Sequence, residues 1–250
     1  MVFIIGAGPG DPDLITVKGA KILSDADVVV YAGSLVNPEL LEYCKNGAQI
    51  YNSAVMTLDE IIALIKEANA AGKKVARVHT GDPSLYGAVQ EQMDRLREEG
   101  IPFTVIPGVS SFLAAAAAIP CELTLPGVSQ TVILTRVEGR TPVPPGEKLA
   151  ALAAHGATMC IFLSVHMVEH VVAELISGGY PECTPVIVAE KASWPEEKIL
   201  RGTLKDIAVK VKEAGVTKTA LIMVGKAFNS GYSPSRLYSG DFTHGFRRRP

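Results

Sequence analysis

Cysteine is scarce in this chain: only four occur among its 250 residues, and no two of them are separated by just two positions. The lack of such a pair argues against a structural zinc site, and widely spaced thiols are typical of a reduced cytosol. No basic leader precedes the apolar residues Met1–Ile5, so this stretch predicts a first strand rather than a signal peptide. We therefore expect a cytoplasmic protein.

Strong net charge and long hydrophobic runs are lacking as well. The net charge is −2 at pH 7, which provides no global attraction to nucleic acid or to an anionic membrane. The alanine-rich stretch Phe112–Ile119 is far too short to span a bilayer. We thus expect no nucleic-acid partner and no membrane partner, and we expect the basic run Arg247–Arg249 to be a solvated tail.

Metal ligands at a suitable spacing are also missing. The five histidines do not form a metal-binding pattern with carboxylates. His166 and His170 are four residues apart and would share a helix face, but the sequence offers no third ligand. The nucleophile motif G-x-S-x-G does not occur either. The sequence predicts no metal site and leaves the catalytic residue unknown.

One stretch in the first half combines a buried strand with a sharp turn. Val75–His79 predicts the strand, and Gly81–Pro83 ends it, because glycine permits a tight turn and proline interrupts a strand ladder. Ser84 is a candidate cap for a helix that runs through Gln90 and Leu96. Ligands of open α/β sheets bind at this edge, which places Asp82 there. An ordinary strand-to-helix turn is the alternative.

Strands and helices alternate on either side of this stretch. The expected strands lie at 2–5, 27–31, 48–51, 75–79 and 103–106, and the expected helices at 14–23, with Thr16 as a cap, 58–71 and 112–119. Repeated alternation of this kind predicts a mostly parallel sheet.

The second half has a different pattern. Its expected strands lie at 131–136, 158–163, 186–190, 198–202 and 219–224, and its expected helices at 147–154, 165–176 and 204–214. Two of the strands follow one another without a helix, which predicts a mixed sheet. We expect two α/β domains, residues 1–119 and 120–242, then a basic tail at 243–250, with the ligand in the cleft between the domains.

The first strand leads into Gly6-x-Gly8-x-Gly10, which invites a dinucleotide-binding interpretation. The pattern departs from that fingerprint, because Asp11 stands where the third glycine is needed and the second strand ends without an acid. Pro9 and Pro12 also remove two amide donors. We therefore reject NAD or FAD binding and keep a glycine turn that lets another molecule approach the backbone.

A third turn follows the strand at 103–106. Pro107–Ser111 opens a helix made of alanines, which predicts close packing on the sheet. The hydroxyl groups of Ser110 and Ser111, together with the free amides of the first helical turn, are also suited to hold a polar ligand group. Both interpretations are compatible.

Taken together, these segments resemble the tetrapyrrole methylase family over essentially the whole chain. The resemblance is carried by GAGPGDPDLITVKG at 6–19, Gly81–Pro83, Pro107–Gly108 and TALIMVG at 219–225. Within the family, YAGSLV at 31–36, ELTLP at 122–126, QTVILTR at 130–136 and ASWP at 192–195 are similar to the members that methylate C-11 of precorrin-4. EGRTPVP at 138–144 and FTHGF at 242–246 are closer to the members that act on cobalt-precorrin-4.

The resemblance implies a methyltransferase that uses S-adenosyl-L-methionine (SAM), bound between two α/β domains, and a homodimer. The positions that match SAM contacts in the family are Pro9, Gly81, Asp82, Leu85, Ser110, Ser111, Leu163, Ala192, Thr219 and Ala220. Uroporphyrinogen methylases of the family have an aspartate, proposed as a base, where this chain has Ala32, so that role does not transfer.

The implied substrate, (cobalt-)precorrin-4, carries many carboxylates, which arginine and lysine recognise. We assign substrate contacts to Gly8, Gly10, Ser34, Arg136 and Arg140. The basic candidates are Arg77, Arg136, Arg140, Lys191, Arg201 and Arg236, and we expect at least half of these six to be solvated surface residues. Methylation of another ring position and a non-catalytic module that binds SAM or a tetrapyrrole are the alternatives to a C-11 methylase of cobalamin biosynthesis.

Overall fold

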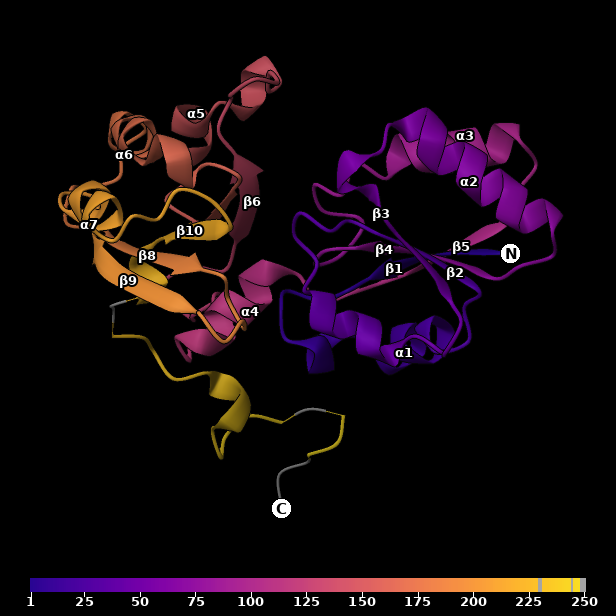
Figure 1. Ribbon diagram of the computed structural model, residues 1–250. Helices are drawn as coiled ribbons and strands as arrows, with labels where there is room; N and C mark the ends of the chain where they lie inside the picture. The colour runs from indigo at the N-terminus through magenta and orange to yellow at the C-terminus, as the bar shows by residue number, and fades with distance from the viewer. Residues whose placement is uncertain (229–230, 244, 248–250) are drawn as a thin grey trace. The chain divides into compact units, whose positions relative to one another are not determined.

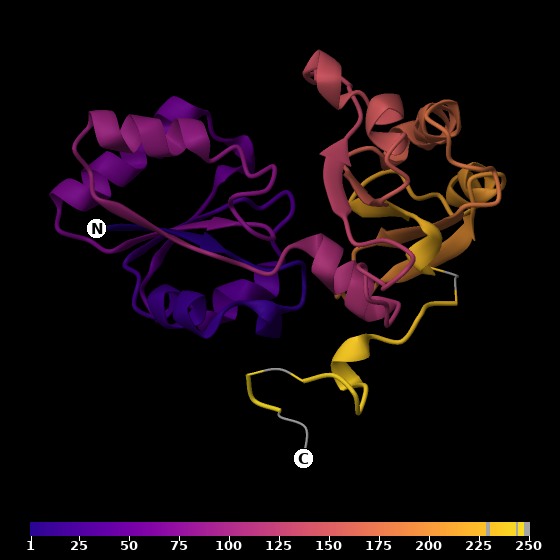
Figure 2. The same cartoon turned by 180° about the vertical axis from the view of Figure 1, so that it is seen from behind.

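The computed structural model describes residues 1–228, 231–243 and 245–247. The chain forms two compact units, shown in Figure 1 and from behind in Figure 2. Unit 1 comprises residues 1–118 together with the segment 191–198, and unit 2 comprises residues 119–190 and the described residues from 199 onward. A segment that is distant in sequence thus completes the first unit.

Unit 1 is built on a parallel sheet, as the alternation of elements predicted. Its strands are β1 (Val2–Gly6), β2 (Val28–Tyr31), β3 (Gln49–Asn52), β4 (Val75–His79) and β5 (Phe103–Ile106), in the order β3-β2-β4-β1-β5. The neighbouring strands pair in parallel, and all five residues of β4 are buried. Every strand therefore ends at the same edge of the sheet.

Helices cover both faces of this sheet (Figure 1). Helix α1 (Val17–Leu23) lies on one face, and α2 (Leu58–Ala70) and α3 (Gln90–Glu98) lie on the other. Thr16 caps α1 as predicted, because its side chain accepts a hydrogen bond from the Gly19 amide. Unit 1 also contains α4 (Ser111–Ala118) and the 3-10 helices η1 (Pro12–Leu14), η2 (Pro38–Tyr43) and η3 (Ser53–Val55).

The helix predicted to begin at Ser84 begins instead at Gln90, so that prediction is wrong. The Asp82 carboxylate accepts a hydrogen bond from the Ser84 amide at 2.8 Å, which closes a local turn. Tyr86 and Ala88 then adopt positive φ angles of 52° and 46°, which no right-handed helix contains. The chain must pass through this strained loop before α3 starts.

Unit 2 is built on a mixed sheet, also as predicted. Its strands are β6 (Val132–Arg136), β7 (Thr158–Phe162), β8 (Pro185–Glu190), β9 (Lys198–Thr203) and β10 (Ala220–Val224), in the order β6-β7-β10-β8-β9. Strands β6 and β7 are parallel, whereas β10 is antiparallel to both β7 and β8. Adjacent connections without a helix account for the mixed directions.

Three helices pack on one face of this second sheet and enclose its core: α5 (Leu149–Ala153), α6 (Val168–Ser177) and α7 (Ile207–Glu213). The 3-10 helices are η4 (Pro145–Glu147), η5 (Val165–Met167), η6 (Lys226–Phe228) and η7 (Arg236–Tyr238). Alternate strand residues such as Met159, Ile161 and Ile222 contribute to the core.

The C-terminal segment differs in part from the solvated basic tail that the sequence predicted. The Arg247 guanidinium donates hydrogen bonds to the carbonyl oxygens of Leu237, Ser239 and Phe242, at distances of 2.6–3.0 Å for Nη2. This arginine therefore holds residues of its own segment together. The rest of that basic run, Arg248 and Arg249, and also His244 and Pro250, lie outside the described residues.

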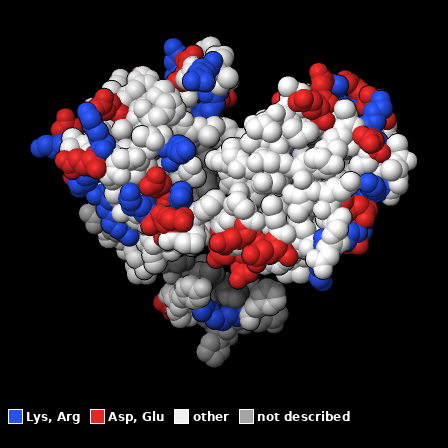
Figure 3. Space-filling view, in the orientation of Figure 1, with Lys and Arg blue, Asp and Glu red and all other residues white. Residues whose placement is uncertain are grey.

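The surface carries charges of both signs. On the face shown in Figure 3, most charged areas contain both basic and acidic side chains, one group of acidic side chains at the lower centre has no lysine or arginine within it, and a broad area of unit 1 is uncharged. No helix within the described ranges is long and apolar enough to cross a membrane.

Candidate functional site

Three glycines bring the ends of β1, β4 and β5 into direct backbone contact. A Cβ atom on Gly6 would lie 2.6 Å from both the Gly108 Cα and the Gly81 carbonyl oxygen. A Cβ atom on Gly108 would lie 2.1 Å from the same Gly81 oxygen. Real side chains do not fit at such distances, so these turns converge only because Gly6 and Gly108 have none. A Cβ atom on Gly81 would have no neighbour closer than 3.7 Å.

Backbone hydrogen bonds fix the same convergence. Gly8 and Gly81 form an isolated antiparallel bridge, in which the Gly81 amide donates to the Gly8 oxygen at 2.7 Å. The Ala7 amide donates to the His79 oxygen, also at 2.7 Å. Gly8 and Gly81 have φ angles of +83° and +60°, a region that favours glycine. The first and second predicted turns therefore form one structure.

Asp82 connects the second turn to the third. One carboxylate oxygen accepts from the Ser84 amide and the other accepts from the Gly108 amide, each at 2.8 Å. Charge-assisted hydrogen bonds of this kind are stronger than neutral ones. The carboxylate is thus a structural link between the ends of β4 and β5, which the sequence had placed at this edge without showing its partners.

The third turn leads into α4 as expected. Ala114, Ala115 and Ala116 are buried, which confirms the predicted close packing. Ser110, which is 5% exposed, directly precedes the helix, and Ser111 is its first residue. The Leu113 and Ala114 amides donate to the Ser110 oxygen, whereas the Ser111 and Phe112 amides at the start of the helix have no acceptor within it. Two hydroxyl groups and free N–H donors therefore lie together at this position.

The segment 191–198 packs on the glycine-rich turn. The Trp194 indole nitrogen donates to the Pro9 oxygen at 3.0 Å, and the Asp11 amide donates to the Ser193 hydroxyl at 3.0 Å. Ala192 is 6% exposed and lies in the same segment. A tryptophan side chain of this same chain lies against the backbone of Gly10, because a Cβ on Gly10 would lie 2.0 Å from the Trp194 Cδ1 atom.

The structure therefore assembles most of the predicted ligand contacts in unit 1 and leaves the others in unit 2. Unit 1 contains Gly8, Pro9, Gly10, Ser34, Gly81, Asp82, Leu85, Ser110, Ser111 and Ala192. Ser34 is exposed and follows β2, apart from the hydrogen bonds that join the three turns. Unit 2 contains Arg136, Arg140, Leu163, Thr219 and Ala220.

Backbone strain coincides with several of these positions. Leu163 and Thr219 have positive φ angles of 54° and 52°, and Lys191 and Ser193, which flank Ala192, have angles of 47° and 70°. Leu163 is also 58% exposed, which is unusual for a leucine. Strained residues persist where the surrounding structure requires them and are enriched at binding sites. No motif in the sequence indicates this strain.

Two basic residues, Arg77 and His79, lie in the buried strand β4. The prediction of a buried strand was right, but sequence reasoning counted Arg77 among the substrate candidates and gave His79 no role. Arg77 is 4% exposed and donates to Gln92 Oε1 and to the Val30 and Val78 oxygens, so it is neither a surface residue nor a substrate ligand as predicted. Burial lowers its pKa to about 10. Two-residue alternation in the predicted strand was the available signal, because it places residues 77 and 79 on one sheet face.

His79 lies beside Arg77 and is also 4% exposed. Its pKa is lowered to about 3, mainly by burial and to a smaller extent by the nearby Arg77 charge. A backbone hydrogen bond with Gly87 has the opposite, weaker effect and raises the pKa. In the described part of the chain, its Nε2 atom is the one buried side-chain nitrogen or oxygen without a hydrogen-bond partner. The imidazole is therefore neutral at physiological pH.

Arg136 and Arg140 have different environments in unit 2. The Arg136 guanidinium donates to the carbonyl oxygens of Val137, Thr141 and Pro142, so it holds the loop that follows β6. Arg140 is exposed and forms no ion pair or hydrogen bond with any described residue. Arg140 is therefore the better placed of the two to meet an external carboxylate.

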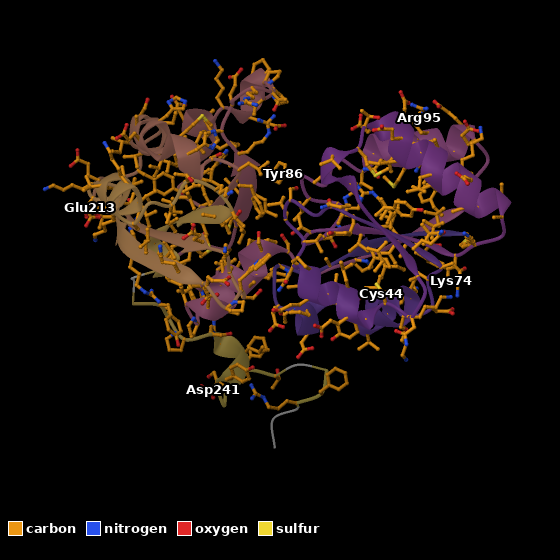
Figure 4. The ribbon with its side chains drawn as sticks, viewed as in Figure 1. Cys44, Lys74, Tyr86, Arg95, Glu213 and Asp241 are labelled. Carbon is orange, nitrogen blue, oxygen red and sulfur yellow. The ribbon has the colours of Figure 1, made fainter. Side chains whose placement is uncertain are left out.

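A pocket of about 380 Å³ lies on the loop between β4 and α3. It is lined by Pro83, Ser84, Tyr86, Gly87, Ala88, Val89, Gln90, Met93 and Val105. None of the predicted ligand contacts lines this pocket, although Leu85 belongs to the same loop. Figure 4 shows Tyr86 at the carboxyl end of the parallel sheet, opposite the end where Lys74 lies.

Comparison with known proteins places the chain in a family. Residues 1–208 match the Tetrapyrrole (Corrin/Porphyrin) Methylases, and the chain belongs to this family. It is 60% identical over 248 residues to the Cobalt-precorrin-4 C(11)-methyltransferase of Methanocaldococcus jannaschii, covering 99% of this chain and 96% of that protein. It is 49% identical to the Precorrin-4 C(11)-methyltransferase of Pseudomonas aeruginosa, covering 98% of each.

Solved structures agree with this assignment. The X-ray structure of a cobalt precorrin-4 methyltransferase, CbiF, is 51% identical with a TM-score of 0.90, covering 92% of this chain and 96% of that one. A uroporphyrin-III C-methyltransferase from Thermus thermophilus, solved in complex with S-adenosylhomocysteine, is 28% identical with a TM-score of 0.74, covering 91% and 93%. The family and its fold are therefore those that the sequence motifs had indicated.

Proposed function

We propose that this chain methylates C-11 of (cobalt-)precorrin-4, giving (cobalt-)precorrin-5 in cobalamin biosynthesis. The observation that carries this proposal is the 60% identity, over 99% of the chain, to a protein named as a cobalt-precorrin-4 C(11)-methyltransferase. Methylation of another ring position is less well supported, since the uroporphyrinogen-III methyltransferase of Bacillus subtilis is 35% identical.

SAM is the proposed methyl donor. A related structure holds S-adenosylhomocysteine, which is SAM without its transferable methyl group. The residues of unit 1 fit such a ligand: the hydroxyl groups of Ser110 and Ser111 and the first two amides of α4, those of Ser111 and Phe112, are donors for its polar groups. SAM supplies an electrophilic methyl group on a sulfonium. Leu163, Thr219 and Ala220 stay predicted contacts by resemblance to the family.

In this proposal the chain's own residues position the methyl donor and the tetrapyrrole relative to one another. Methyl transfer from a sulfonium is an in-line displacement, which requires alignment and the exclusion of water more than a strong acid or base. The links through Gly81, Asp82 and Gly108 hold the three turns in a single arrangement before any ligand arrives. Ala32 carries no group that could remove a proton, and we assign no catalytic base.

Product analysis tests this function. The purified chain is incubated with SAM and either cobalt-precorrin-4 or metal-free precorrin-4, and the product is analysed by mass spectrometry and by NMR with a labelled methyl group. We expect one added methyl at C-11. A methyl group at another ring carbon supports the second candidate, and binding of both molecules without any product supports a non-catalytic module.

Arginine substitutions test the substrate contacts. Because Arg140 is exposed and unpaired among the described residues, Arg140→Ala should weaken tetrapyrrole binding by roughly ten- to a hundred-fold, the effect of losing one charged contact. Arg136→Ala should also weaken it, through disorder of the loop that Arg136 holds. The affinity for S-adenosylhomocysteine should barely change in either variant. Unchanged tetrapyrrole affinity in Arg140→Ala would remove that residue from the substrate site.

We also propose that the protein is a cytoplasmic homodimer. The family resemblance supports the dimer, and the scarcity of cysteine supports a reducing compartment. Light scattering of the purified chain measures the oligomeric state, and cell fractionation measures the location.

A further inference from the structure

The glycine-rich turn of unit 1 is held by a side chain that the proposed function leaves unused, Trp194. Its indole N–H donates to the Pro9 oxygen at 3.0 Å. Its ring fills the space beside Gly10, where a Cβ atom would lie 2.0 Å from Cδ1 and 2.1 Å from Nε1. Gly10 therefore lacks a side chain in order to admit this ring.

The polar backbone groups of the turn are also satisfied from outside it. The Asp11 amide donates to the Ser193 hydroxyl at 3.0 Å, and the buried Asn37 side-chain amide donates to the Gly10 oxygen at 2.9 Å. Pro9 has no N–H to form a local hydrogen bond. The shape of residues 9–11 is thus set by other segments, of which 191–198 supplies two of the three hydrogen bonds.

The segment 191–198 is itself held in a strained form. Lys191 and Ser193 have positive φ angles, although neither is a glycine. The Ser193 amide donates to the Glu197 carboxylate at 2.7 Å, and the Lys191 ammonium lies 5.6 Å from the centroid of the Trp194 ring. These contacts fix the Trp194 ring against the glycine-rich turn. Backbone strain of this kind persists where the surrounding structure requires it, and it is enriched at functional sites.

We propose that Trp194 is a positioning residue for the methyl donor. It acts through Pro9 and through its own neighbour Ala192, which are both predicted SAM contacts, by holding the turn and the segment 191–198 in register. This inference rests on the proposed function, because it takes SAM as the ligand of the turn.

Trp194→Phe tests the role of the indole N–H, because it keeps an aromatic ring. We expect the affinity for S-adenosylhomocysteine, measured by calorimetry, to fall roughly tenfold, the effect of one lost hydrogen bond and a loosened turn. The KM for SAM should rise, while kcat at saturating SAM stays near wild type. Tyr238→Phe, which changes an aromatic residue that is 83% exposed, is the control.

A purely structural role gives a different result. The Trp194→Phe protein would then have a lower melting temperature, but its folded fraction would bind S-adenosylhomocysteine with wild-type affinity. That outcome overturns the inference.

A double-mutant cycle tests the contact between Gly10 and Trp194. Gly10→Ala should weaken S-adenosylhomocysteine binding in the wild-type chain, because the new methyl group displaces the indole. The same change in a Trp194→Ala background should have no further effect. Equal losses in both backgrounds would show that Gly10 is required for a reason other than Trp194, and would overturn the inference.

Fluorescence separates this inference from the proposed function. Trp194 is the sole tryptophan of the chain, so its emission reports this position alone. Binding of S-adenosylhomocysteine should shift the emission and reduce quenching by acrylamide. If calorimetry detects no binding even at millimolar concentrations, the proposed function fails. If binding occurs and the emission and quenching do not change, the inference about Trp194 fails and the function stands.

Discussion

The two units bury different kinds of polar side chain. Unit 1 buries Arg77 and His79 beneath the ends of its strands, whereas the buried polar residues of unit 2 within the described ranges are hydroxyl-bearing: Thr135, Thr158, Ser164 and Thr184. A hydroxyl is satisfied by one or two backbone groups, as when Ser164 donates to the Phe162 oxygen at 2.6 Å. A guanidinium needs several acceptors at once, and Arg77 finds three.

This difference extends to the predicted binding residues. In unit 1 most of them lie on turns that are in contact through backbone atoms, where Gly6 and Gly108 have no room for even a methyl group. In unit 2, Leu163 and Arg140 are exposed, and Arg136, Thr219 and Ala220 are half-buried. The turns of unit 1 are thus closely packed, whereas the predicted binding residues of unit 2 are not tightly enclosed. Substitutions in unit 1 should therefore have the larger effects.

The largest effect is expected at Gly108. Gly108→Ala places a methyl group 2.1 Å from the Gly81 oxygen, and backbone atoms on both sides prevent relief. We expect the variant to lose at least about 3 kcal/mol of unfolding free energy or to fail to fold. Gly146→Ala is the matched control, because nothing lies within 4 Å of a Cβ there. Urea unfolding measures both, and equal stabilities would contradict the close-packing account of unit 1.

A smaller effect is expected at Asp82. Asp82→Ala removes two charge-assisted hydrogen bonds, so we expect a loss of about 1.5–3 kcal/mol of unfolding free energy. The affinity for S-adenosylhomocysteine should fall with it, since the second and third turns lose their link. Asp59→Ala serves as the control, because the Asp59 ion pair with Arg95 is at the surface. Wild-type affinity in Asp82→Ala would show that the carboxylate only forms a turn.

The pH dependence of stability should depend on His79. Its folded-state pKa of about 3 lies below the ordinary histidine pKa of 6.5, so unfolding takes up a proton as the pH falls below 6.5. This stability is complete above pH 6.5 and is lost progressively towards pH 3. Lowering the pH from 7.5 to 5.5 should cost about 1 kcal/mol from this residue.

The measurement is the difference in unfolding free energy between those two pH values. His79→Leu should abolish most of the difference, whereas His155→Gln, which changes an exposed histidine of unit 2, should leave it unchanged. Carboxylates titrate mainly below this range. The same pH dependence in His79→Leu as in the wild type would mean that His79 is not buried in neutral form.

The smallest effect on stability is expected at Leu163. Leu163→Gly relieves a left-handed conformation that costs about 1–2 kcal/mol, but glycine also gains entropy in the unfolded state. We expect the unfolding free energy to change by less than about 1 kcal/mol, while the affinity for S-adenosylhomocysteine decreases. A large loss of stability would show that unit 2 also encloses its binding residues tightly.

Much of the fold followed from local pattern. Four-residue β5 was predicted at its observed limits, and the Thr16 cap was predicted from one hydroxyl before an apolar repeat. The start of α3 was predicted wrongly. The Asp82–Ser84 hydrogen bond and two positive φ angles keep the loop before Gln90 out of the helix that its sequence pattern favours. Local propensity does not include such contacts.

Some features of the candidate site could likewise be predicted from the sequence, and others could not. Motif spacing located the turns that contain Gly81, Asp82 and Ser110, because strand ends and turn residues are local features. It did not show that Arg77 is buried or that Arg136 holds its own loop, since an arginine in a sequence carries no sign of its acceptors.

The sequence by itself determined the family, the parallel and mixed sheets, and the three turns at the ends of β1, β4 and β5, because these depend on periodicity and on residues close together in the chain. Only the tertiary structure decided why the glycines are needed. Gly6 and Gly108 make room for one another, and Gly10 makes room for Trp194, which is 184 residues away. A missing side chain is visible in a sequence, but the group that occupies its space is brought there by the fold.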